Sequence, residues 1–247
     1  MTRGKLLALG LGVYALGLLT TAPATFVDAG LQRASDGRLR LAAAQGTVWS
    51  GAGQIEILDA GQRIVVAKDL AWRLLPASLW RGRIVCEVGL DRATKRFPIT
   101  ISLTRIELAD ADINLPAAVL GLGVPQLAPL KLGGDLLLHV ATLSIGRSQT
   151  RGNATLQWRA ASSALTPVSP LGDYELRFED EGVAMHASLR TLQGPLQLDG
   201  KGTWAHGGNP AFLATARISP QYRQQLEPLL RLVAVDRGEG NFELQLK

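Results

Sequence analysis

Apolar and polar residues alternate along most of the chain after residue 38. This period of two predicts β-strands that have one face in an apolar environment and the other face in water. Short turn sequences such as Glu181-Gly182 and Gln193-Gly194-Pro195 separate successive runs, so we expect antiparallel meanders. The clearest alternating runs are Gln54–Ile57, Phe97–Thr104, Tyr174–Glu179, Val183–Leu189 and Phe242–Lys247.

Helical periodicity is confined to short stretches. Leu115–Leu120 fits one or two turns that open at Pro116. Ser219 and Pro220 are a favourable N-cap and first-turn pair, and Pro228 is expected to kink or split the helix that follows. The predicted fold class is therefore mainly β: a curled, mostly antiparallel sheet with a few short helices, behind a single N-terminal transmembrane helix. The apolar face of the second predicted helix carries Tyr222, Leu226, Leu229, Leu230 and Val233.

The N-terminal residues have the pattern of a membrane anchor. Residues 1–5 carry two positive charges, and residues 6–27 carry none over a length that can cross a bilayer as a helix. The basic flank predicts a cytoplasmic N-terminus over 1–5, a transmembrane anchor over 6–27 and a periplasmic β-rich domain over 28–247. A cleavable signal peptide is the alternative, because Ala22-Pro23-Ala24 matches a cleavage site. We favour the anchor because the charge-free stretch continues past that site.

A weak internal similarity relates two tryptophan motifs. Gly46-Thr-Val-Trp49-Ser-Gly51 resembles Gly200-Lys-Gly-Thr-Trp204, since each combines a tryptophan with glycine-rich turn chemistry after an alternating run. Two similar β-lobes, divided within Leu115–Pro129 or Ser162–Pro170, would explain this similarity. One continuous curled sheet is an equal alternative. The pattern also leaves open whether the apolar face is a closed core or an open groove.

Composition narrows the classes of function. The net charge is +5, but no run of five like charges occurs, which disfavours nucleic-acid binding and leaves a weak attraction to anionic lipid head groups. Aromatic residues make up only 5% of the chain, which argues against carbohydrate or single-stranded nucleic-acid surfaces built on ring stacking. The single cysteine, Cys86, excludes an intrachain disulfide. It lies in a β-branched run, so we expect it to be buried as a small hydrophobic residue.

The chain lacks the residue patterns of common catalytic and metal sites. Its histidines, His139, His186 and His206, do not have the helical spacing of a zincin, and a lone cysteine excludes a thiolate metal cluster. The acidic run Glu179–Glu181 is typical of a solvated hairpin tip rather than of opposed catalytic carboxylates. We therefore expect no catalytic, cofactor-binding or metal-binding residues, no cofactor and no enzymatic activity. The residues expected to anchor the core, with a ligand groove as the alternative, are Trp49, Trp72, Trp80, Trp158 and Trp204.

Several glycine, tryptophan and leucine motifs occur in an order that resembles a known family. Each motif alone is weak, so the order and spacing carry the specificity. In both respects the chain resembles type II secretion system protein N, also called general secretion pathway protein N, over nearly its whole length. The motifs are Gly46-Thr-Val-Trp49-Ser-Gly51, Leu70-Ala-Trp72-Arg-Leu-Leu-Pro76, Pro125-Gln-Leu-Ala-Pro129-Leu-Lys-Leu-Gly133-Gly134, Ser169-Pro170-Leu171-Gly172-Asp173-Tyr174 and Leu196-Gln-Leu198-Asp-Gly200-Lys-Gly202-Thr-Trp204.

This resemblance implies a non-catalytic accessory or assembly component of a type II secretion system, which exports folded proteins from the periplasm across the outer membrane of Gram-negative bacteria. It also implies a single-pass protein of the cell inner membrane with most of the chain in the periplasm. The expected partners are other secretion components of the inner membrane and periplasm. The family is more distantly similar to large envelope proteins whose curled β-sheets form lipid-carrying grooves. A periplasmic lipid-binding or lipid-transfer protein, with a lipid ligand on its apolar face, is therefore the alternative function.

Overall fold

The chain divides into two compact units, residues 1–96 and residues 97–247. A computed structural model describes residues 14, 17, 20–91, 95–146, 149–182, 184–205, 212–232, 234–238 and 240–246. The boundary after Arg96 lies outside both stretches where the sequence suggested a division, Leu115–Pro129 and Ser162–Pro170. Those positions were wrong because each stretch connects two long strands that pair with each other inside the second unit.

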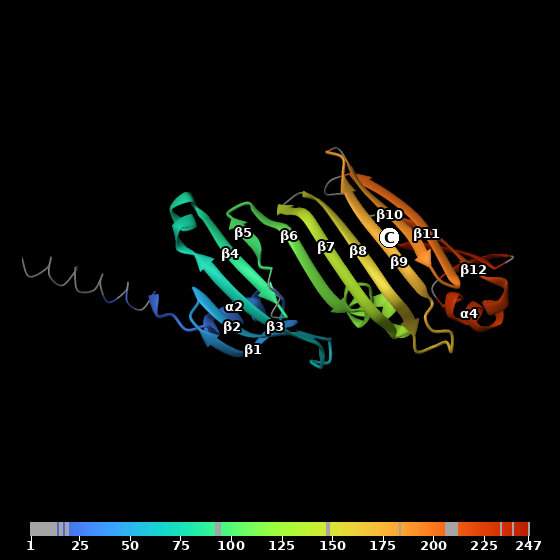
Figure 1. Ribbon diagram of the computed structural model, residues 1–247, viewed down its shortest axis with the longest axis horizontal. Coiled ribbons are helices and arrows are strands. Elements are labelled where there is room, and N and C mark those ends of the chain that lie inside the picture. Colours follow the sequence, from blue (N-terminus) through green and yellow to red (C-terminus); the bar gives the residue numbers. More distant parts are fainter. Residues whose placement is uncertain are drawn as a thin grey trace, which may run out of the picture. The chain divides into compact units, whose positions relative to one another are not determined.

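Unit 1, residues 1–96, is an antiparallel sheet preceded by a helix (Figure 1). Each strand pairs with the next strand along the chain. Its elements are the α-helix α2 (Thr25–Ala34), the strands β1 (Leu39–Gly46), β2 (Ser50–Leu58) and β3 (Ile64–Leu75), the 3-10 helix η1 (Pro76–Arg81) and the strand β4 (Arg83–Leu90).

A small core around Trp72 joins α2 to the sheet of unit 1. The indole Nε1 of Trp72 donates a hydrogen bond to the backbone oxygen of Val48 at 3.1 Å. The ring lies over Gly51, where an added Cβ would come within 2.8 Å of the ring atom Cη2. Only glycine fits beneath the ring, which explains the last glycine of the Gly46–Gly51 motif. The buried members of this core are Ala24, Leu41 and Trp72, and the partly buried members are Val27, Leu31, Ala44, Leu70 and Cys86.

Unit 2, residues 97–247, is a longer antiparallel meander (Figure 1). Each strand from β5 to β11 pairs with its successor, but β12 pairs with β14, which leaves β13 at the edge. The strands are β5 (Phe97–Ser102), β6 (Arg105–Pro116), β7 (Leu132–Gly146), β8 (Thr150–Ser163), β9 (Gly172–Asp180), β10 (Ala184–Gln193), β11 (Leu196–Ala205), β12 (Phe212–Ile218), β13 (Val235–Gly238) and β14 (Asn241–Leu246).

The prediction of mainly antiparallel β-structure with a few short helices is confirmed, but one alternating run is longer than its strand. β5 ends at Ser102, and Leu103 lies exposed in the turn that follows. Ser102 Oγ closes this turn by donating a hydrogen bond to the backbone oxygen of Arg105 at 2.9 Å. A turn residue can continue the alternation of apolar and polar residues without pairing with a neighbouring strand. The alternation over Phe97–Thr104 therefore predicts a longer strand than β5.

The short helices of unit 2 lie near their predicted positions and differ in detail. Leu115 and Pro116 end β6, and the helical turns follow them. Ser219 is the N-cap residue, and its backbone oxygen accepts from the amide of Tyr222 at 2.9 Å, but its side chain makes no capping hydrogen bond. Pro228 lies inside α4 without splitting it, and the chain instead changes from 3-10 to α geometry at Arg223. These helices are η2 (Ala117–Val119), α3 (Leu120–Gly123), η3 (Pro125–Leu130), η4 (Pro220–Tyr222) and α4 (Arg223–Leu230).

The helix α4 covers one end of the unit 2 sheet (Figure 1). Its leucines are buried on the face that the sequence predicts. Tyr174 lies in the same core, and its hydroxyl donates a hydrogen bond to the backbone oxygen of Leu196 at 2.9 Å. The buried members of this core are Leu130, Ala161, Val168, Leu171, Tyr174, Leu196, Ala216, Ile218, Leu226, Leu229, Leu230 and Phe242.

Much of the predicted transmembrane segment, namely residues 6–13, 15–16 and 18–19, lies outside the described residues. Among the residues that the structure does describe, none of the helices combines the length and the apolar character of a membrane span. The last residues of the predicted segment belong to unit 1. Ala24 is buried, and Val27 packs against the core around Trp72.

Candidate functional site

An exposed apolar surface lies on the first three strands of unit 2. Directly opposed residues of an antiparallel pair share one face of the sheet. The register places Ile99 opposite Leu108, and it places Ile106 between Ile101 and Ile145. Ile101, Ile106 and Ile145 are 40%, 44% and 45% exposed, so three neighbouring aliphatic side chains face solvent together. We call this surface the open apolar strip; it consists of Ile99, Ile101, Ile106, Leu108, Leu143 and Ile145.

The open apolar strip continues toward the closed core. In β7 the apolar positions change phase between Val140 and Leu143, where the register against β8 shifts by one residue. In β6 the apolar positions change phase at Asp110, which has a φ of 50°. An inserted or left-handed residue reverses the alternation, so Leu143 stays on the face of the buried Val140. Leu108 likewise stays on the face of the buried Ala111. The apolar face therefore has a closed end beneath α4 and an open end on β5–β7.

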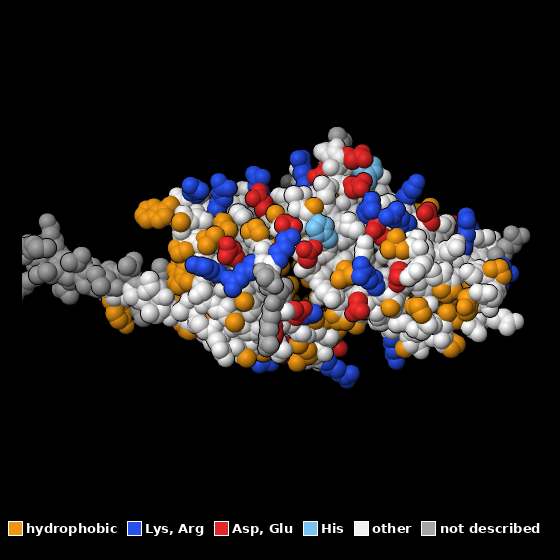
Figure 2. All heavy atoms as spheres, in the orientation of Figure 1, with side chains coloured by type: hydrophobic (Ala, Val, Ile, Leu, Met, Phe, Trp, Pro, Cys, Tyr) orange, Lys and Arg blue, Asp and Glu red, His pale blue; other side chains and the backbone are white. Residues whose placement is uncertain are grey.

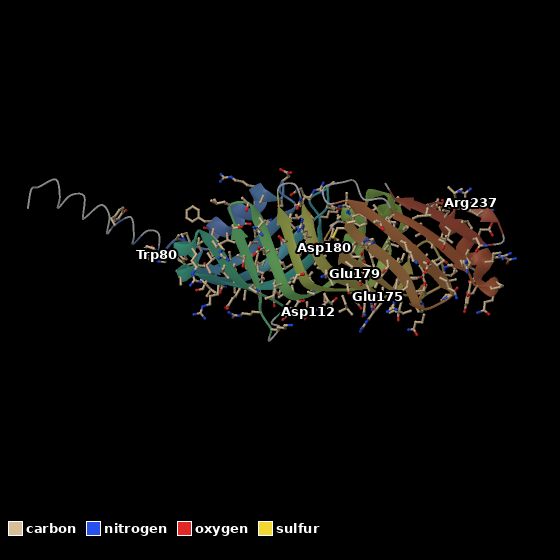
Figure 3. All side chains as sticks on the ribbon, turned by 90° about the horizontal axis from the view of Figure 1, so that it is seen from above. Trp80, Asp112, Glu175, Glu179, Asp180 and Arg237 are labelled. Atoms are coloured by element: carbon tan, nitrogen blue, oxygen red, sulfur yellow. The ribbon has the colours of Figure 1, made fainter. Side chains whose placement is uncertain are left out.

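A charged network lies on the opposite, polar face of unit 2, where Figure 3 labels Glu175. The Glu175 side chain is only 5% exposed, and its carboxylate accepts hydrogen bonds from Arg177 Nε at 2.7 Å and Arg190 Nε at 3.0 Å. Gln157 Nε2 donates a further bond at 3.2 Å. Burial alone would raise the pKa of Glu175, but these hydrogen bonds outweigh it and hold the pKa below its usual range. The network links β8, β9 and β10 and has the character of a structural brace.

The predicted histidine and acidic positions form cross-strand pairs. His139 Nδ1 lies 2.6 Å from Asp112 Oδ1, and both side chains are exposed. His186 Nε2 lies 3.2 Å from Glu181 Oε2, at the turn after β9. His206 lies outside the described residues. Within the described parts of the chain, no group of three or more His, Cys, Asp or Glu side chains is placed to hold a metal ion.

Cys86 lies in β4 and is partly buried against the core around Trp72. Burial raises the pKa of its thiol, and the nearby Glu87 carboxylate adds to this effect. The thiol is therefore protonated at neutral pH. Cys86 packs against an apolar core as predicted, but it is only partly buried.

The tryptophans divide between core and surface. Trp72 is buried, and Trp158 packs against the unit 2 core, with its ring centroid 5.7 Å from that of Tyr174. Trp158 Nε1 donates a hydrogen bond to the backbone oxygen of Gly133 at 3.0 Å. Trp80, in contrast, is 95% exposed, so the prediction that it anchors the core was wrong. The reason is local: Trp80 is carried by η1, a short connection between β3 and β4.

Trp49 and Trp204 do not occupy equivalent positions. Trp49 lies in the turn between β1 and β2, whereas Trp204 lies within β11 opposite Met185. Their sequence similarity therefore does not reflect a repeated structural element.

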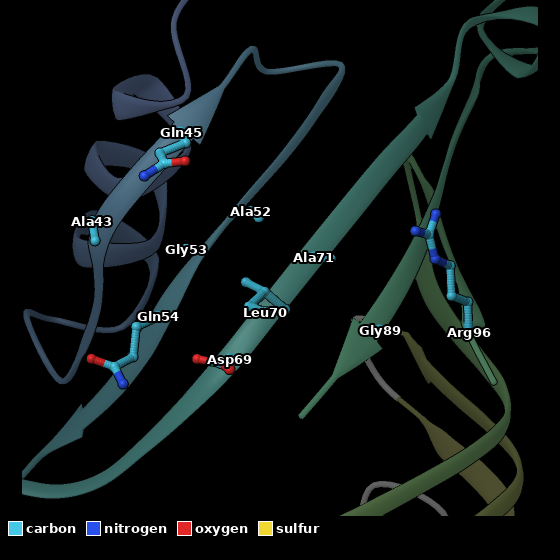
Figure 4. Close-up of a pocket in the computed structure, with 10 residues that line it drawn as sticks. All are labelled: Ala43, Gln45, Ala52, Gly53, Gln54, Asp69, Leu70, Ala71, Gly89 and Arg96. Carbon is cyan, nitrogen blue, oxygen red and sulfur yellow. The ribbon is translucent and has the colours of Figure 1, made fainter. Parts of the chain in front are cut away.

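An open groove of about 590 Å³ lies on unit 1 (Figure 4). Small residues such as Ala52 and Ala71 form its floor together with the polar side chains of Gln54 and Asp69. Arg96 extends along its side, past Gly89. This mixed lining suits polar groups and water better than an acyl chain.

Two functional features were missed by sequence reasoning. The alternation of Phe97–Thr104 was recognised, but only the strand register aligns its isoleucines with those of β6 and β7. The exposure of Trp80 could have been predicted from the sequence. Trp80 lies in a short segment between Pro76 and Gly82, and such a segment is typical of a turn rather than of a strand.

Comparison with known proteins gives one match. A family model described as "Type II secretion system (T2SS), protein N" matches residues 37–245, which extend from just before β1 into β14 and cover part of unit 1 and most of unit 2. No curated protein and no solved structure matches the chain significantly.

Proposed function

Because the chain belongs to the type II secretion system protein N family, we propose that it is a non-catalytic accessory component that helps to assemble this secretion machinery at the inner membrane. Family membership implies interaction with other type II secretion components. The charge-free residues 6–27 support attachment to the membrane. The basic residues before them support a periplasmic position for both units.

The open apolar strip is the observation that carries a binding role. Isolated exposed apolar residues are ordinary, but adjacent ones aligned across three strands form a patch of the kind that marks interaction sites. The polar side chains of Glu175, His139 and His186 are instead engaged with neighbours on their own sheet. We therefore assign partner binding to the strip.

Strand addition at the sheet edge is a weaker route for docking. β13 is short and exposed, and its residues include Asp236 and Arg237. Arg237 Nε is paired with Glu243 Oε2 at 2.9 Å. Short, charged edge strands disfavour pairing with another chain, so the proposal rests on the strip rather than on this edge.

Complementation of a deletion strain tests the binding role. The double variant Ile106→Ser/Ile145→Ser keeps the strands but removes two exposed aliphatic side chains, and we expect secreted hydrolases in the medium to fall toward the level of the deletion strain. Leu213→Ser is the matched control, because Leu213 is 47% exposed in β12 and lies outside the strip. Normal secretion by the double variant, at wild-type protein levels on an immunoblot, would exclude the strip as the docking surface.

Lipid binding is the second candidate function, and the composition of the strip favours it. All six of its side chains are aliphatic, and the strip leads toward the closed core, so an acyl chain could lie along it. Mass spectrometry of the purified protein should then detect bound lipid, and a fluorescent acyl probe should bind the delipidated protein. Loss of probe binding in Ile106→Ser/Ile145→Ser, with secretion unchanged, would favour lipid handling over assembly.

A further inference from the structure

A second exposed apolar surface lies at the η1 end of unit 1. Trp80 projects there almost free of contacts, as Figure 3 shows. The space-filling view shows hydrophobic side chains gathered at this end of the unit (Figure 2). We call this surface the η1 patch; it consists of the exposed side chains Phe26, Leu79, Trp80 and Ile84.

Three of the four members of the η1 patch line a common hollow, and Trp80 follows one of them, Leu79, in η1. Phe26, Leu79 and Ile84 line a cavity of about 350 Å³, although they come from α2, η1 and β4. The lining is entirely apolar, and its other members are Ala22, Val48, Trp49, Leu74 and Leu75. The patch is therefore continuous across three elements, which distinguishes it from scattered exposed residues.

The corner that carries Trp80 is held in a defined shape. Ser78 Oγ donates a hydrogen bond to the backbone oxygen of Leu75 at 2.6 Å and accepts one from the amide of Val85 at 3.1 Å. Gly82 has a φ of 66°, the left-handed conformation that ends η1 and returns the chain into β4. The structure thus presents Trp80 on a fixed support.

The charge-free N-terminal segment enters unit 1 at this patch. The amide of Val48 donates a hydrogen bond to the backbone oxygen of Ala22 at 2.9 Å, and Pro23 forms a bridge with Thr47. Ala22 and Val48 also line the apolar hollow. If the part of the charge-free segment that precedes these bonds crosses a bilayer, the bonds place the η1 patch at the bilayer surface.

The side chains around the patch match the chemistry of a bilayer surface. Tryptophan is enriched where the hydrocarbon meets the head groups, because its ring is apolar and its N–H is polar. Arg81 follows Trp80 directly and Arg83 lies two residues further on; both are exposed and can approach lipid phosphates.

We propose that the η1 patch contacts the phospholipid bilayer that holds the N-terminal segment, with Trp80 in the interfacial layer. This inference rests on the membrane attachment proposed above and adds a second contact to it. Its consequence is that unit 1 lies against the membrane surface rather than hanging from a free tether.

A site-specific probe tests the proposal in the full-length chain. Trp80→Cys is made in a Cys86→Ala background and labelled with an environment-sensitive fluorophore. The protein is then placed, one copy per particle, in nanodiscs of phosphatidylethanolamine and phosphatidylglycerol. Ile64→Cys is the matched control, since Ile64 is 56% exposed and lies at the other end of β3, roughly 35 Å away at the usual rise per residue.

We expect the fluorophore at position 80 to emit at shorter wavelength than it does in water. Lipids that carry spin labels near their head groups should quench this emission. Neither effect is expected at position 64. Emission typical of water at position 80, with the chain still in the disc, would overturn the patch proposal and leave the anchor intact. Blue-shifted emission at position 80 that spin-labelled lipids do not quench would also overturn the proposal, because the patch would then face protein. If an alkaline wash instead releases the chain from vesicles of the same lipids, the membrane attachment itself fails.

Discussion

In both units helices cover part of one face of an antiparallel sheet, but the cores that they enclose differ greatly in size. In unit 2, α4 and η3 enclose a large core at one end of the sheet, and the face opens on β5–β7. In unit 1, α2 encloses a small core around a single large side chain, Trp72. Both units fix an indole N–H on a backbone carbonyl, Val48 for Trp72 and Gly133 for Trp158. Among the described residues, the core beneath α4 has twelve buried members and the core around Trp72 has three, and each core lies within one unit, so core substitutions should report on one unit at a time.

The largest effect is expected from Leu226→Ala, which removes a fully buried side chain from α4. Truncation of a buried leucine leaves a cavity and costs about 3 kcal/mol of unfolding free energy. Hydrogen exchange should show lost protection in α4 and β11–β14, with unit 1 unchanged. Leu232→Ala, at an exposed position just beyond α4, is the control and should change the unfolding free energy by less than about 0.5 kcal/mol. Equal loss of protection in unit 1 would contradict the separation of the units.

Gly51→Ala should destabilise unit 1 by about 2 kcal/mol, because the new methyl group collides with the ring of Trp72. Exchange protection should fall in β1, β2 and β3. Gly30→Ala, in α2, is a control with the opposite sign: an added Cβ meets nothing within 4 Å, and alanine favours a helix over glycine by about 1 kcal/mol. An unchanged stability of Gly51→Ala would show that the Trp72 ring and the backbone oxygen of Gln45, which the new methyl group also meets, can both move aside.

Glu175→Gln should lower the unfolding free energy at neutral pH by about 1 to 2 kcal/mol, because it removes the charge that Arg177 and Arg190 contact. The pKa of Glu175 is lowered in the folded chain, so its ionised form adds stability above the unfolded value of 4.5. That contribution is lost as the pH falls through the folded pKa. Denaturant titrations should therefore converge for the two proteins in acid. Glu179→Gln, at an exposed position of the same strand, is the control and should change the unfolding free energy at neutral pH by less than about 0.5 kcal/mol.

The smallest effect is expected from Trp80→Ser. Because Trp80 is exposed, the unfolding free energy in detergent should change by less than about 0.5 kcal/mol. A loss of more than about 1 kcal/mol would mean that Trp80 packs against the protein as Trp72 does.

The sequence predicted those features that depend on local pattern. Alternation identified β9 and β10, and the spacing of Leu226, Leu229 and Leu230 identified the buried face of α4. These predictions were correct because the buried residues of a strand recur every second position and those of a helix every three or four positions.

The features that depend on distant contacts were not predictable in the same way. Ile101 and Met185 occupy similar alternating runs, yet one is exposed and the other buried, because burial depends on which helix or strand lies over the face. Trp72 and Trp80 differ for the same reason. The unit boundary after Arg96 depends on contacts between strands and leaves no mark in composition.

The strand order of the protein has a consequence for how it is made. Every strand of unit 1 pairs with its neighbour in the chain, and the unit is complete by residue 96. Contacts between sequence neighbours form quickly, and N-terminal units fold first as a chain emerges. Unit 1 can therefore be finished before most of unit 2 exists, whereas β12, which pairs with β11 on one side, gains its second partner only when β14 has been made.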